Sequence, residues 1–266
     1  MKRQIEQGDF FPRKKSQEEV PEKKERVESL YQIFHLIYRG RFSEAKNLIP
    51  ADKRHLPLDF SYPSSWSHNW PLLHHAVRYG NCEIIEYLLD GGADIELKGS
   101  DDYTPLITAA SDNEEECCEL LLNRGANVNA CTTTNRTPLM IASYHNKERI
   151  CRLFISRGAN IHTCDDSYCT PMYWAVYHAN TSLINLLLSK GARADTTTKH
   201  GITLLGLAKI HESAHIVSLL EDHFVAINLS GVISRGLDDG HDFSDFLVKG
   251  ICDCRLFLIV ANFAYH

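Results

Sequence analysis

Histidine and cysteine are the residue types in this sequence that are best suited to metal binding or catalysis. The 266 residues include 14 histidines and 9 cysteines. Zinc sites generally combine two pairs of ligands, with the members of each pair close together in the chain. Cys252 and Cys254 form one close pair, but no second cysteine pair has that spacing. We therefore predict no metal site.

Sequence motifs give no support for nucleophilic or cofactor-dependent catalysis. The chain contains no glycine-rich phosphate loop, no nucleophile elbow and no His-Glu-x-x-His element. Cys117 and Cys118 fall in an apolar stripe where other segments carry isoleucine. We therefore interpret both as small buried hydrophobic side chains. For Cys131 and Cys164, a redox role is the alternative to ordinary loop cysteines. We predict no enzyme activity, no cofactor and no small-molecule substrate, with a hydrolase or metal enzyme as the competing hypothesis.

Composition and charge favour a folded protein that does not bind nucleic acid. Hydrophobic residues make up 44% and charged residues 23% of the chain, close to the average of globular proteins. A net charge of -6 provides no broad attraction to a phosphate backbone. Nucleic acid is therefore an unsuitable main ligand.

The ends of the chain and its cysteines favour an intracellular location. The first residues are charged rather than apolar, so we expect no secretory signal. The apolar stretch 256–264 is shorter than the roughly 20 residues of a membrane helix. An odd number of scattered cysteines suits reduced thiols. We predict a cytoplasmic protein without a membrane span, and a nuclear location is the alternative.

A fixed period of 33 residues is the strongest pattern in the chain, and such a period is typical of a solenoid built from repeated units. Alanine and glycine both follow it. The periodic residues are Ala76, Ala109, Ala142, Ala175 and Ala208, and Gly92, Gly125, Gly158 and Gly191.

Each period predicts a helix, a turn, a second helix and a loop. Thr104-Pro105 and Thr137-Pro138 open the first helix, because threonine can cap its free amides and proline fits its first turn. Apolar pairs at helical spacing follow, as in 150–155, and predict a buried stripe on the second helix. A periodic glycine then ends that helix in a left-handed conformation.

At these positions the chain resembles the ankyrin-repeat family. The likeness rests on Thr-Pro-Leu at 104–106 and 137–139, on the periodic alanines, and on Gly-Ala-Asn-Val-Asn at 125–129. It covers residues 67–223 as five units. The resemblance implies an all-α ankyrin-repeat solenoid of stacked helix-turn-helix units with hairpin loops and a concave binding face. The family's histidine after Thr-Pro-Leu is kept only as His74, which predicts a softer array.

Both ends depart from the repeat pattern. Residues 1–27 are charged and poor in apolar residues, which predicts a disordered arm. Residues 28–66 predict a capping pair of helices and a loop, since a solenoid needs its first interface covered. Residues 224–266 predict a C-terminal helical cap or extension.

The residues after each periodic alanine face the concavity in the ankyrin family. Tyrosine and histidine recur there at the 33-residue step, and exposed aromatic side chains often anchor partner proteins. Packing against adjacent repeats is the competing interpretation. The candidate binding residues on this face are Arg78, Tyr79, Asp112, Tyr144, His145, Tyr177, His178 and His211.

Three further residues in the loops are candidates for function. Tyr103 and Arg136 belong to loop tips, which in ankyrin proteins usually complete the binding footprint, and simple solvent exposure is the alternative. Asn129, eight residues after Leu121, resembles ankyrin sites that an asparaginyl hydroxylase modifies.

The sequence thus predicts a scaffold or adaptor that binds another protein through its concave face and loop tips. The alternative is the substrate-recognition subunit of a ubiquitin ligase, in which residues 224–266 recruit the ligase. No Leu-Pro-Leu-Pro element supports that recruitment.

Overall fold

The computed structural model describes residues 32, 33, 35–37, 39, 41–48 and 70–223 of the chain. The chain divides into two units, Met1–Leu56 and Pro57–His266. The predicted arm at 1–27, most of the predicted cap at 28–66, and the predicted extension at 224–266 lie outside the described residues, so these three assignments stay predictions.

The described part of the first unit is helical. Residues 32, 33 and 35–37 are helical, and helix α2 follows at Phe42–Leu48. Ile33, Ile37 and Ala45 are fully buried, so these turns have an apolar, buried side. The apolar spacing in the sequence predicts two helices here.

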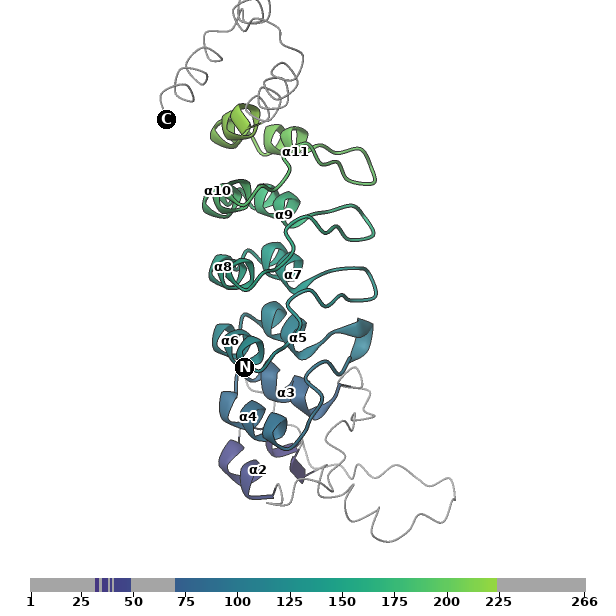
Figure 1. The fold of residues 1–266 in the computed structure, drawn as a ribbon, viewed down its shortest axis with the longest axis vertical. Coiled ribbons are helices and arrows are strands. Elements are labelled where there is room, and N and C mark those ends of the chain that lie inside the picture. Colours follow the sequence, from purple (N-terminus) through teal and green to yellow (C-terminus); the bar gives the residue numbers. More distant parts are fainter. Residues whose placement is uncertain (1–31, 34, 38, 40, 49–69, 224–266) are drawn as a thin grey trace, which may run out of the picture. The chain divides into compact units, whose positions relative to one another are not determined.

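The described part of the second unit consists of helix pairs stacked in one direction (Figure 1). The first helix of each pair, here called inner, packs against the inner helix of the next pair, and the outer helices do the same. The inner helices are α3 (Leu72–Arg78), α5 (Pro105–Asp112), α7 (Pro138–Tyr144), α9 (Pro171–Tyr177) and α11 (Leu204–Ile210). The outer helices are α4 (Cys82–Asp90), α6 (Glu115–Asn123), α8 (Glu148–Ser156), α10 (Thr181–Ser189) and the helical residues 214–223.

The core of this stack lies between the inner and outer helices. Inner helices are buried almost all round, as shown by the continuous buried run from Pro105 to Ala110 in α5. Outer helices bury one stripe each, such as Ile150, Cys151 and Phe154 in α8. The predicted all-α solenoid is confirmed, and the described residues contain no β-strand; Thr197 and Thr203, in one loop, form an isolated bridge.

Threonine caps four of the five inner helices, as the sequence predicts. The hydroxyl of Thr137 accepts a hydrogen bond from the amide of Met140, and Thr104, Thr170 and Thr203 act in the same way. Gly125 and Gly158 have φ angles of +91° and +84° after the outer helices, which is the left-handed conformation predicted for them.

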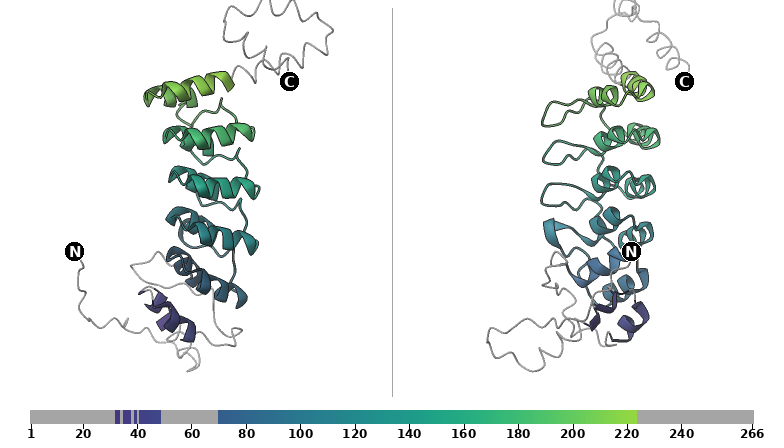
Figure 2. Two further views of the ribbon diagram at one scale, coloured as in Figure 1. Left: turned by 90° about the vertical axis from the view of Figure 1, so that its left-hand side faces the viewer. Right: turned by 180° about the vertical axis from the view of Figure 1, so that it is seen from behind.

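A loop, here called a finger, follows each of the four labelled outer helices and projects from the side of the stack that carries the inner helices (Figures 1 and 2). One backbone hydrogen bond joins each finger to the next in the described part of the row. The fingers are residues 91–104, 124–137, 157–170 and 190–203, and the bonds run from Thr133 to Asp101 (3.0 Å), Asp166 to Thr134 (3.3 Å) and Lys199 to Ser167 (2.9 Å). The helix η2 (Ser100–Asp102) lies within the first finger.

Candidate functional site

Aromatic side chains gather where the inner helices α7, α9 and α11 end. Tyr144 is the last residue of α7 and Tyr177 is the last residue of α9, one 33-residue step later. Stacking the two helices brings these equivalent positions side by side. We call the following residues the aromatic cluster: Tyr144, His145, Tyr173, Trp174, Tyr177, His178 and His211.

Most rings of the cluster contact one another edge to face, and the rings of Tyr173 and Tyr177 are stacked at 24°. The Tyr144 and Trp174 ring centres are 4.8 Å apart at 89°, and those of Trp174 and Tyr177 are 5.8 Å apart at 74°. Tyr177 also meets the ring of His211, on the next inner helix, at 5.5 Å and 82°. Such arrangements are favourable for aromatic pairs and fix the orientation of each ring.

The cluster is held rigidly yet remains partly exposed. Tyr144 is 40% exposed and Tyr177 is 43% exposed, whereas Tyr173 and Trp174 are half-buried beside them. The tyrosines therefore present surface to solvent while neighbouring rings pack against them, a combination that suits binding.

Arg136 connects this cluster to the neighbouring finger. Its guanidinium carbon lies 5.7 Å from the ring centre of Tyr144 and 5.9 Å from that of Trp174, within cation–π range. Its Nε donates to Asp165 Oδ2 at 3.2 Å, and the Asp165 side chain is only 2% exposed. Arg136 thus spans two helix pairs, at the base of its finger next to the capping Thr137.

Asp165 organises the finger before α9. Its Oδ1 accepts hydrogen bonds from the amides of Ser167 and Cys169, each at 2.9 Å. Thr132, one period earlier, accepts in the same way from the amides of Thr134 and Arg136. Thr198, the equivalent residue of the last finger, accepts a hydrogen bond from the amide of Ile202.

The histidines of the cluster occupy different environments. His178 Nε2 donates to the carbonyl oxygen of Tyr144 at 2.6 Å. His145 is exposed, and its pKa is lowered by partial burial and by the nearby Lys147. His211 is exposed beside Tyr177. Of the three histidines that recur at the 33-residue step, His178 therefore forms a hydrogen bond between repeats, whereas His145 and His211 are exposed.

A second group of candidate residues lies over α3 and α5. Arg78 is 5.5 Å from the Trp70 ring centre and 4.0 Å from Asp112, whose pKa is raised by partial burial despite this arginine. The Tyr103 ring stacks on Trp70 at 6.3 Å and is half-buried, and Tyr79 is 38% exposed. This end of the inner face thus combines the Arg78–Asp112 ion pair with aromatic rings.

His74 and His75 are buried beneath this second group. His74 Nε2 donates to the Tyr103 carbonyl oxygen at 2.8 Å. This hydrogen bond joins helix α3 to the finger that follows α4. Among the described residues its Nδ1 has no hydrogen-bond partner. Burial lowers the pKa of each imidazole to about 4, so both rings are neutral in the folded protein at neutral pH.

Residues 73–165 match the family model of ankyrin repeats in three copies. The chain carries ankyrin repeats. The helix pairs that begin with α9 and α11 lie beyond this match and repeat the same architecture. No curated protein sequence matches the chain significantly. Ankyrin repeats are generally protein-interaction modules, and proteins built from them are typically non-enzymatic binding scaffolds.

Trp174 is the main residue of the site that sequence reasoning missed. At the equivalent positions of the two preceding ankyrin repeats, Ile141 and Thr108 are 2% and 0% exposed. An indole is too large for that space, so it reaches the surface between Tyr144 and Tyr177. The signal available in the sequence was a tryptophan at a position where the period otherwise places a small or aliphatic residue.

Asn129 lies in the finger before α7, apart from the aromatic cluster. Its Oδ1 accepts a hydrogen bond from the amide of Asn160, in the next finger, at 2.8 Å. The backbone amide of Asn129 donates to Asn127 Oδ1 at 2.9 Å, and Asn129 is exposed. The side chain therefore joins two ankyrin repeats, and its predicted hydroxylation stays a prediction.

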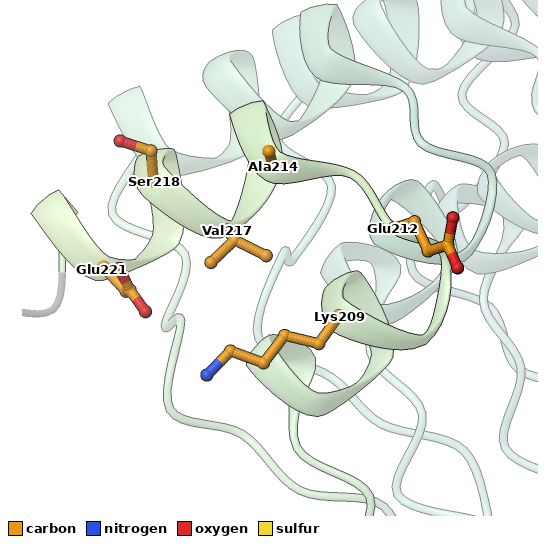
Figure 3. Close-up of a pocket in the computed structure, with 6 residues that line it drawn as sticks. All are labelled: Lys209, Glu212, Ala214, Val217, Ser218 and Glu221. Atoms are coloured by element: carbon orange, nitrogen blue, oxygen red, sulfur yellow. The ribbon is translucent and has the colours of Figure 1, made fainter.

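A shallow, open hollow of about 380 Å³ lies on the last described helix pair. Figure 3 shows it between α11 and the helical residues 214–223, with Lys209 and Glu221 among the residues around it. Its lining is mixed and exposed, so we assign it no ligand. The lining residues are Lys209, Glu212, Ala214, Val217, Ser218 and Glu221.

The described residues also bear on metal binding and on membrane spanning. No group of three or more metal-ligating side chains lies close together in the described part of the chain. Within the same residues, no helix is both long enough and apolar enough to cross a membrane.

Proposed function

We propose that this chain is a scaffold or adaptor that binds a partner protein through the inner face of its ankyrin repeats. The aromatic cluster on α7, α9 and α11 is the centre of the interface. The observation that carries the proposal is the partial exposure of Tyr144 and Tyr177, at 40% and 43%, on rings that neighbouring aromatics hold in place.

Energetic considerations favour such a cluster as an anchor. Tyr, Trp and Arg are enriched among the few interface residues that carry most of the binding energy. Rings already fixed by edge-to-face contacts lose little conformational entropy on binding. A standard interface buries about 800 Å² on each partner. The inner face and the bases of the fingers together would form its footprint.

The chemistry of the cluster indicates what the partner presents. Ring faces accept apolar and planar side chains, and the tyrosine hydroxyls and His145 supply hydrogen bonds. Arg136 is only partly available to a partner acid, because its Nε already donates to Asp165. The proposal includes no catalytic activity and no cofactor.

Affinity capture followed by mass spectrometry tests this proposal. Tyr144→Ala combined with Tyr177→Ala should abolish partner capture from cells while the circular dichroism spectrum stays helical. Asn185→Ala, an exposed change on the outer helix α10, is the matched control and should capture normally. Unchanged capture by the double tyrosine variant would contradict the assignment of the interface.

The alternative function, a ubiquitin-ligase substrate receptor, depends on residues 224–266. These lie outside the described residues, and nothing in the described part of the chain favours this function. A chain that ends at His223 separates the two functions in the same experiment. Loss of ligase subunits with the tail, while other partners persist, would indicate a receptor.

A further inference from the structure

Two cysteines meet across the interface between the first two described helix pairs. Cys82 is the first residue of the outer helix α4, and Cys117 is the third residue of the outer helix α6. Their Sγ atoms are 3.6 Å apart although the residues are 35 positions apart in the chain. The helices α4 and α6 pack against each other, so the contact is part of the repeat interface.

The repeat architecture does not require thiols at these two positions. The equivalent pairs at the next three interfaces combine a polar residue of the outer helix with an aliphatic one, so the cysteine pair is peculiar to the first interface. The three equivalent pairs are Glu115 with Ile150, Glu148 with Leu183, and Thr181 with Ile216.

The two thiols differ in access to solvent. Cys82 is partly exposed, so it is the more accessible of the two residues to a small oxidant in solution. Cys117 is fully buried, and burial followed by the proximity of Cys82 raises the pKa of its thiol. A buried, protonated thiol reacts slowly with a dissolved oxidant. The 3.6 Å distance between the two sulfur atoms nevertheless places Cys117 to attack an oxidised Cys82 when its own proton leaves. The pair therefore has one accessible partner and one resolving partner.

We propose that Cys82 and Cys117 are an oxidation site at which a hydroperoxide forms a reversible disulfide between the first and second described helix pairs. In the first step, the Cys82 sulfur attacks the peroxide, which gives Cys82 sulfenic acid and water when the oxidant is hydrogen peroxide. In the second, the Cys117 sulfur attacks the Cys82 sulfur and a second water leaves with the Cys117 proton. Two thiols are oxidised by two electrons, and one peroxide is reduced to two waters.

The geometry requires little movement for this reaction. The sulfur atoms must approach from 3.6 Å to the bonding distance, a change of roughly 1.5 Å shared between two side chains. The closed loop contains the whole finger before α5. Formation of the disulfide lowers mainly the conformational entropy of the unfolded chain, and it links the first helix pair covalently to its neighbour.

Peptide mapping of the full chain tests the site. The folded protein is treated with hydrogen peroxide, free thiols are alkylated, and the chain is digested with trypsin without reduction. The expected product is peptide 79–98 linked to peptide 99–124, and it should disappear when a dithiol reductant is added first. Absence of this product from peroxide-treated folded protein would overturn the proposal.

Peptide 99–124 contains both Cys117 and Cys118, so matched variants are needed. Cys118 is also fully buried, but no sulfur contact with Cys82 involves it. The linked product should survive Cys118→Ser and be lost in Cys117→Ser and in Cys82→Ser. Loss in Cys118→Ser with retention in Cys117→Ser would refute the pairing.

Unfolding in urea provides a second readout that does not depend on the peptides. Peroxide treatment should raise the unfolding midpoint of the wild-type chain, and a dithiol should reverse the rise. Cys82→Ser changes only a half-exposed side chain, so it should fold and show no such rise. An equal rise in Cys82→Ser would assign the effect to another cysteine and contradict the proposal.

Discussion

Nε2 of His178 lies 2.6 Å from the carbonyl oxygen of Tyr144, and this hydrogen bond joins the C-terminal end of α9 to that of α7. The bond uses an acceptor at the end of a helix, where carbonyl groups lack intrahelical partners. It also fixes the imidazole beside the Tyr177 ring, 5.1 Å away. His178 therefore links two repeats in addition to lining the candidate interface.

Removal of this imidazole should weaken the stack. We expect His178→Ala to lower the free energy of unfolding by about 0.5–1 kcal/mol, the net value of a partly exposed hydrogen bond. Urea unfolding followed by circular dichroism measures the change. His211→Ala is the control, because His211 is exposed and, like His178, makes a ring contact with Tyr177. Equal losses in the two variants would argue against a stabilising role of the bond.

The carboxylate of Asp165 should matter more for stability. It accepts two backbone amides and Arg136 Nε while its side chain is 2% exposed. Asp165→Ala leaves these donors unpaired, and we expect a loss of about 1.5–3 kcal/mol, as for hydrogen bonds to charged groups. Asp166→Ala, an exposed neighbour bonded to Asn135, should cost less than about 1 kcal/mol. A similar loss in both variants would contradict this ranking.

The buried histidines predict a pH dependence of stability. Burial lowers the pKa of His74 and His75 from 6.5 to about 4. Between these values the unfolded chain binds more protons than the folded protein, so the free energy of unfolding falls as the pH is lowered. The expected slope is about 1.4 kcal/mol per pH unit for each histidine.

Urea unfolding at several pH values between 6.5 and 4 measures this slope. The double variant His74→Gln with His75→Gln removes both titrating groups, so its stability should fall less steeply over the same range. Parallel slopes for the variant and the wild type would assign the dependence to other groups.

Hydroxylation of Asn129 is the fourth expectation. In cells with an active asparaginyl hydroxylase, the peptide 125–136 should gain one oxygen atom, and fragment ions should place it on Asn129 rather than on Asn127 or Asn135. The gain should be absent from Asn129→Ala. Detection of only unmodified Asn129 in such cells would refute the prediction.

The repeat architecture could be predicted from the sequence because its determinants are local and periodic. Thr137 caps its helix through an amide three residues away, and the left-handed Gly125 ends a turn within its own repeat. Each such feature recurs at 33-residue spacing and reinforces the others. The stacking of the helix pairs follows from the buried stripes that these segments share.

The composition of the site could be predicted only in part, because it depends on contacts between repeats. The exposure of Tyr144 and Tyr177 follows from their period together with the resemblance to the ankyrin family. The position of Arg136 over the rings depends on Asp165, 29 residues later, and on the size of Trp174. Neither dependence is visible in a single repeat.

Hydrogen bonds join the fingers, whereas buried apolar side chains join the helices, so the two sides of the stack are mechanically unequal. On the helical side, separating two repeats exposes buried apolar residues. On the finger side it breaks hydrogen bonds, namely one backbone bond per neighbouring pair in the described row and side-chain bonds such as those of Asn129 with Asn160 and of Asn135 with Asp166. The array is therefore most compliant toward bending that spreads the fingers apart. A partner that contacts α7, α9 and α11 together would therefore set the curvature of these three repeats and the spacing of the fingers between them.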